Sequence, residues 1–82
     1  MPRYFFDLHN DVDALDAEGK DLPDVAAAKA NALKEAREMI QASVGEEGKI
    51  NLHHCIQVRD ETGDTIYTLQ FRDAVVIITG DG

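Results

Sequence analysis

The stretch Ile50–Phe71, INLHHCIQVRDETGDTIYTLQF, decides the fold. Apolar and polar residues alternate on both sides of its centre, and a period of two is typical of half-buried strands. Between the two runs, Asp60 and Gly63 take the first and fourth places of a tight turn, where the glycine supplies the positive φ of a bulge. The stretch therefore predicts an antiparallel hairpin with strands over Ile50–Arg59 and Thr65–Phe71.

The first strand of this hairpin has two faces of different character. One face collects Ile50, Leu52, His54, Ile56 and Val58, and the other collects Asn51, His53, Cys55, Gln57 and Arg59. The first face matches the apolar set Tyr67, Leu69 and Phe71 of the return strand. We expect these apolar sets to form one wall of the core.

A second hairpin is predicted near the beginning of the chain. Arg3–His9 alternates as a strand, with Tyr4, Phe6 and Leu8 toward the core and Phe5, Asp7 and His9 on the opposite face. The segment Asp16-Ala17-Glu18-Gly19 repeats the turn pattern of Asp60–Gly63, and a short second strand is expected after it. The large Phe5 side chain indicates a second packed surface on that opposite face.

A single helix is predicted between the two hairpins. Pro23 and Asp24 suit a helix N-terminus, and alanine-rich sequence runs to about Val44, with Gly45 as the expected stop. At 100° per residue the apolar side collects Val25, Ala28, Ala32, Leu33, Ala36, Met39, Ile40 and Val44. Lys29 falls within this apolar side. We interpret it as a side chain whose stem packs while its amine reaches water, the alternative being a salt bridge or an anion contact.

These elements predict an α+β fold in the order β-β-α-β-β, with one helix packed on a mainly antiparallel sheet. Residues 1–82 form one domain, in which 75–82 are a further strand or an extended arm. One helix leaves the other face of the sheet bare, and Phe5 and Cys55 should lie there. We therefore predict a homodimer formed by sheet faces or by the apolar run Val75, Val76, Ile77 and Ile78.

Composition limits the possible partners and the compartment. The 82 residues carry 16 acidic against 8 basic side chains, a net charge of −8, which disfavours nucleic acid and anionic membranes. Cys55 is the single cysteine, so no intrachain disulfide can form. No signal peptide and no apolar run of membrane-spanning length are recognisable. These features predict a cytoplasmic protein in a reducing environment.

Several segments resemble one family of small bacterial proteins. The start Met1-Pro2-Arg3-Tyr4-Phe5-Phe6 is followed by Asp16-x-Glu18-Gly19-x-x-Leu22-Pro23-Asp24 and an alanine-rich helix. Val58-x-Asp60-Glu61-x-Gly63 and Phe71-Arg72-Asp73-Ala74 complete the pattern. The chain is similar, outside 75–82, to a mainly alphaproteobacterial family classed as a domain of unknown function. The resemblance implies no activity, cofactor or catalytic residue.

Only a few residues suggest chemistry. His53 and Cys55 share a strand face, and His9 could join them as a third ligand of zinc or a related metal, although no metal-binding spacing supports the set. The same residues could form a Cys–His nucleophile pair, but catalysis would also need an oxyanion hole and a pocket. The acidic loop 10–16 lacks the glycine and the distal glutamate of an EF-hand. No cofactor motif is present.

These observations favour a non-enzymatic protein-binding or regulatory module. Small size, acidic charge and an apolar run at 75–78 carry this hypothesis. The alternative is a small-ligand or metal-binding protein that uses His9, His53 and Cys55, and a weak enzyme ranks third.

Overall fold

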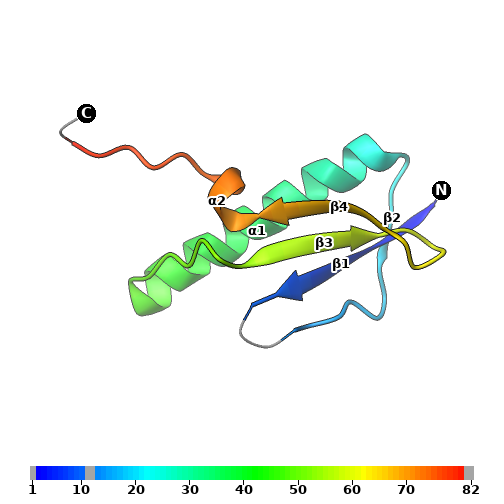
Figure 1. The fold of residues 1–82 in the computed structure, drawn as a ribbon, viewed down its shortest axis with the longest axis horizontal. Coiled ribbons are helices and arrows are strands. Elements are labelled where there is room, and N and C mark those ends of the chain that lie inside the picture. Colours follow the sequence, from blue (N-terminus) through cyan, green and yellow to red (C-terminus); the bar gives the residue numbers. More distant parts are fainter. Residues whose placement is uncertain (1, 11–12, 81–82) are drawn as a thin grey trace.

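The computed structural model describes residues 2–10 and 13–80. Its elements are β1 (Arg3–His9), β2 (Lys20–Asp21), α1 (Val25–Glu47), β3 (Cys55–Arg59), β4 (Thr65–Gln70) and a short α2 (Phe71–Ala74). The strands form one antiparallel sheet in the order β2-β1-β3-β4, and α1 runs along one face of it (Figure 1). The predicted α+β fold and its β-β-α-β-β order are confirmed, and α2 is an addition.

The core lies between the sheet and α1. Its buried residues are Tyr4, Phe6, Ala28, Ala32, Ala36, Ile40, Ile56, Val58, Leu69, Phe71 and Ala74. The three core alanines of α1 are fully buried, and their small side chains let the helix lie close to the sheet. The alternation predicted for β1 and β3 is therefore confirmed over the length of the strands.

The C-terminal end of α1 extends beyond the sheet (Figure 1). A helix of 23 residues is about 35 Å long, whereas the seven residues of β1 span about 23 Å. Val25 and Val44 were expected in the core, but they are 43% and 45% exposed, and they lie in the first and last turns of α1.

The helix begins as predicted and ends later than predicted. The Asp24 carboxylate caps the N-terminus by accepting a hydrogen bond of 2.8 Å from the Ala27 amide. The expected stop at Gly45 is wrong, because the helix continues through the good helix formers Glu46 and Glu47. Gly48 adopts the left-handed conformation, with φ of 68°, and its amide donates to the Val44 carbonyl.

The strand β3 is shorter than the predicted Ile50–Arg59. Its pairing with β1 ends where Cys55 lies opposite His9, so the residues before Cys55 have no neighbouring strand of β1 to pair with. A turn at Leu52 and His53 replaces the expected extended backbone. His53 therefore does not share a strand face with Cys55, which corrects the geometry expected from the alternation.

The apolar run near the end of the chain forms an arm. In the described part of this run, residues 75–80, no residue belongs to a strand. Figure 1 shows the arm leaving α2 and pointing away from the body of the domain. Val75 packs against the core, whereas Val76, Ile77 and Ile78 are 85%, 59% and 86% exposed.

Candidate functional site

The sheet face that α1 leaves uncovered is polar. We call it the outer face, and it carries Phe5, Asp7 and His9 of β1 and Cys55, Gln57 and Arg59 of β3. Phe5 and Cys55 lie there as the alternation predicted, but the face is rich in charged and polar groups rather than apolar. It therefore does not resemble the apolar dimer surface that we expected for it.

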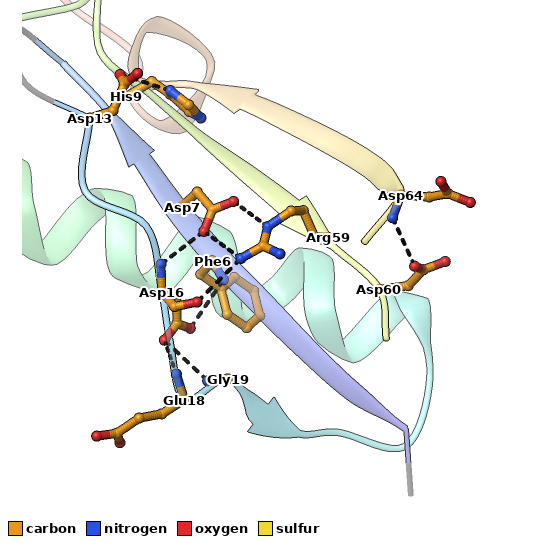
Figure 2. Close-up of polar contacts among 10 residues, drawn as sticks. All are labelled: Phe6, Asp7, His9, Asp13, Asp16, Glu18, Gly19, Arg59, Asp60 and Asp64. Atoms are coloured by element: carbon orange, nitrogen blue, oxygen red, sulfur yellow. Dashed lines mark hydrogen bonds and ion pairs between the residues drawn. The ribbon is translucent and has the colours of Figure 1, made fainter. Parts of the chain in front are cut away.

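An ion pair lies at the centre of the outer face. Asp7 is only 2% exposed, and its Oδ2 lies 2.5 Å from Arg59 Nε while its Oδ1 lies 3.1 Å from Arg59 Nη2 (Figure 2). The Arg59 guanidinium also lies 5.0 Å from the centre of the Phe5 ring, a cation–π distance. The second packed surface expected around Phe5 is this contact.

The ion pair holds the loop that contains the first Asp-x-x-Gly turn. Asp7 Oδ1 accepts a hydrogen bond from the Asp16 amide, and Arg59 Nη2 donates to the Asp16 carbonyl. The Asp16 carboxylate in turn accepts hydrogen bonds from the amides of Phe6, Glu18 and Gly19 (Figure 2). One connected set of hydrogen bonds thus joins β1, β3 and the loop.

Both carboxylates of this set are held in the charged form. Burial raises the pKa of Asp7, but the hydrogen bonds from Arg59 and the Asp16 amide outweigh it, so the pKa lies below its ordinary value. Burial also raises the pKa of Asp16, and the three backbone amides again bring it below the ordinary value. Ionised carboxylates with these partners stabilise the loop, and they are not suited to general acid or base chemistry at neutral pH.

The sequence-predicted ligands only partly converge. His9 and Cys55 are paired residues on β1 and β3, and His9 Nδ1 lies 2.9 Å from Asp13 Oδ1. His9 Nε2 is buried without a hydrogen-bond partner in the structure. His53 lies exposed in the turn before β3. Within 2–10 and 13–80, no three His, Cys, Asp or Glu side chains form a group that could hold a metal ion.

A cavity of about 380 Å³ lies between the second half of α1 and the end of the sheet. It is lined by Leu8, Asn10, Met39, Ile40, Ser43, Glu47, Lys49, Asn51, His54 and Phe71. His54 packs edge-on against the Phe71 ring, with ring centres 5.6 Å apart, and its Nε2 is buried without a partner in the structure. The alternation predicts a core position for His54, but the turn that shortens β3 places it in this cavity.

The Lys29 amine reaches water, as in the first of the two interpretations given for this residue. The residue is exposed, and its amine lies 5.0 Å from the centre of the Tyr67 ring. A cation over an aromatic face, with the alkyl stem along apolar surface, is how long basic side chains pack at the edge of a core.

A family model described as a domain of unknown function (DUF6894) matches residues 3–72. The chain belongs to the DUF6894 family. The matched residues of this DUF6894 domain include all four strands and α1, and the match ends within α2, before the arm. No curated protein and no solved structure matches the chain. No helix of the described residues is long and apolar enough to cross a membrane.

Proposed function

We propose that this DUF6894 domain is a non-enzymatic protein-binding module, and that the arm Val75–Ile78 is its binding segment. The observation that carries the proposal is the exposure of Val76, Ile77 and Ile78 at 85%, 59% and 86%. These three side chains follow one another on an extended segment that points away from the domain. Contiguous exposed apolar surface of this kind marks interaction sites.

The physical chemistry of the arm suits strand addition to a partner. Burying a valine or isoleucine side chain completely contributes about 1.5–3 kcal/mol. Burial of the exposed side chains of the arm in an interface would therefore contribute several kcal/mol to binding. Val75 already has extended backbone angles, with φ of −137° and ψ of 157°. β-Branched residues favour strands, and a strand added to a partner's sheet edge gains main-chain hydrogen bonds along its length.

The outer face supports the same proposal indirectly. Its carboxylates at Asp7 and Asp16 accept hydrogen bonds from Arg59 and from backbone amides, so their charges are used within the domain. The apolar side chains of Val76, Ile77 and Ile78 in the arm are, by contrast, mostly exposed. We also propose a cytoplasmic, bacterial setting, which the free Cys55 thiol and the resemblance in sequence support.

The experiment compares wild type with the double variant Val76→Asp/Ile78→Asp as tagged baits in lysate of the native cell. Leu15→Asp is the matched control, because Leu15 is also 70% exposed but lies outside the arm. We expect a protein retained by wild type and by the control to be lost from the double variant. That protein, purified, must then bind wild type at a fixed stoichiometry. Retention by the double variant would contradict the proposal.

A second candidate function rests on the cavity that contains His54. A volume of about 380 Å³ falls within the range of small-molecule sites, and the apolar residues Leu8, Met39 and Phe71 lie beside a buried imidazole nitrogen that lacks a partner. We propose a small, partly apolar molecule with a hydrogen-bonding group as its ligand. The original alternative, metal binding by His9, His53 and Cys55, now has only His9 and Cys55 side by side.

NMR titration of the ¹⁵N-labelled protein tests both ligand hypotheses. Pooled metabolites test the cavity as a small-molecule site, and zinc, added separately, tests the pair of His9 and Cys55. A ligand in the cavity shifts the amide resonances of Ser43, His54 and Phe71, and His54→Phe abolishes the shifts. Zinc bound by the histidine–cysteine pair shifts His9 and Cys55 instead, and Cys55→Ala removes the effect. Unchanged spectra with every pool and with zinc would reject this candidate function.

A further inference from the structure

The two edges of the sheet differ in whether their outward backbone groups form hydrogen bonds. On the β1 side, Leu8 and Ala14 exchange two backbone hydrogen bonds of 2.9 and 2.8 Å, and Lys20 of β2 pairs with Tyr4. Between these points the Phe6 amide donates to the Asp16 carboxylate. The outward amides of β1 are thus satisfied one after another, and β2 is short and charged, both of which block the approach of another strand.

The β4 side is open. β4 is the last strand of the sheet, and the hydrogen bond of 2.9 Å from the Phe71 amide to the His54 carbonyl fixes its register with β3. Hydrogen-bonded and non-hydrogen-bonded pairs alternate in an antiparallel ladder. The backbone amides and carbonyls of Tyr67 and Leu69 are therefore directed toward β3. The amide and carbonyl of Thr68 and the amide of Gln70 therefore point outward, toward an edge that no strand of the described chain covers, while the Gln70 carbonyl lies at the N-cap of α2.

The lack of charge on the β4 edge and on the arm favours a second copy of the chain as the partner. The domain carries a net charge of −8, so two copies repel each other over most of their surface. The six residues of β4, TIYTLQ, and the arm, VVII, contain no charged residue. These two segments are where two acidic copies can approach with least repulsion. Neither has the charged residue or proline that normally protects an exposed strand.

We propose that the arm of one copy adds as a strand to the β4 edge of a second copy. The inference rests on the proposed function of the arm and names its partner and docking site. Figure 1 shows that α2 directs the arm away from the β4 strand that precedes it, so the arm does not lie along the β4 edge of its own chain. A two-fold axis makes the exchange reciprocal and closes the assembly as a homodimer.

The first test measures molar mass by light scattering and the dissociation constant by sedimentation equilibrium. Wild type and Leu15→Asp should be dimers at about 100 µM, whereas Ile78→Asp raises the dissociation constant by at least about tenfold. Thr68→Pro should do the same, because the outward amide of Thr68 makes no bond within the sheet. Thr68→Asp serves as a second edge variant if the proline variant loses its circular dichroism. A monomeric wild type, or an edge variant that dimerises as wild type does, overturns the proposal.

The second test locates the contact in the dimer by disulfide formation. In a Cys55→Ser background, chains with Ile78→Cys are mixed with chains that carry Thr68→Cys, and the mixed disulfide is counted by mass spectrometry. The reference mixture replaces Thr68→Cys with Leu15→Cys. Faster mixed-disulfide formation at position 68 supports arm-to-edge pairing, and equal rates overturn it. Arm-dependent capture of another protein by a monomeric wild type would leave the proposed function standing while rejecting this inference.

Discussion

Arg59 and Asp7 pair across β1 and β3 on the face that α1 does not cover, through two contacts of 2.5 and 3.1 Å. The carboxylate is almost fully buried, while the Arg59 side chain is 29% exposed. This asymmetry means that the two partners are not equivalent. Loss of the arginine leaves a charge without its ion-pair partner in a site that water hardly reaches.

Arg59→Met should therefore lower the free energy of unfolding by about 3–5 kcal/mol, the usual cost of breaking a buried pair on one side. Urea denaturation at neutral pH measures it. Arg3→Met is the matched control, because Arg3 pairs with Asp21 and both side chains are about half exposed. That variant should lose less than about 1 kcal/mol. Equal losses of unfolding free energy in the two variants would show that burial of Asp7 does not explain the cost of removing Arg59.

The same carboxylates predict the response of the fold to acid. The pKa of Asp7 and that of Asp16 lie below the ordinary value of 3.8, so between the two values the unfolded chain binds more protons than the folded chain. Their contribution is fully present at neutral pH and is lost as pH falls below about 4. Denaturation from neutral pH to about pH 3 should show this loss in wild type. In Asp7→Asn the decrease should be shallower; a decrease as steep as that of wild type would contradict the assignment to Asp7.

The first turn predicts a strong effect at Gly19. Its φ is 71°, and a Cβ atom there would lie 2.8 Å from the Tyr4 carbonyl oxygen, so Gly19→Ala meets both backbone strain and a clash. Strain of this kind costs about 1–3 kcal/mol. Gly48 has φ of 68° with nothing within 4 Å of the same position, so Gly48→Ala isolates the strain from the clash. Thermal denaturation should show the larger loss for Gly19→Ala, and similar losses would exclude the clash.

Local signals account for the parts of the fold that the sequence predicted. The alternation around Asp60–Gly63 and the Asp24 cap each depend on a few neighbouring residues, and both are confirmed. The lengths of β3 and α1 were wrong because they depend on other segments. The pairing of β3 with β1 ends at Cys55 and His9. The helix α1 continues past Gly45 and ends at Gly48, the glycine that takes the left-handed conformation.

The candidate site was harder to predict for the same reason. Asp7 and Arg59 were each placed on a strand face, but their contact joins residues 52 positions apart and follows from the register of β1 with β3. Alternation predicts a core position for His54, whereas the turn before β3 places it in the cavity. The pairing of His9 with Cys55 could be predicted from the sequence, because both residues lie on outer-face positions of adjacent strands.

Glu35 should respond to pH in the opposite sense to Asp7. Burial of this α1 side chain raises its pKa above the ordinary 4.5, although Lys20 and the hydrogen bond from Asn31 act against this. The folded chain then holds the proton more tightly, so the contribution of Glu35 to stability is present in acid and is lost as pH rises through the folded pKa. Glu35→Gln stays uncharged and can still accept the hydrogen bond from Asn31. It should therefore be more stable than wild type at neutral pH, with the difference vanishing at about pH 3.

Glu38→Gln provides the control, because any lost acidic charge reduces the repulsion within a chain of net charge −8. Glu38 is exposed, and its Oε1 lies 3.9 Å from Lys34 Nζ, a contact that is worth little in water. If the gain at Glu35 came only from net charge, Glu38→Gln would give the same gain at neutral pH. A larger free energy of unfolding for Glu35→Gln than for Glu38→Gln therefore assigns the effect to the burial of Glu35, since both variants change the net charge equally.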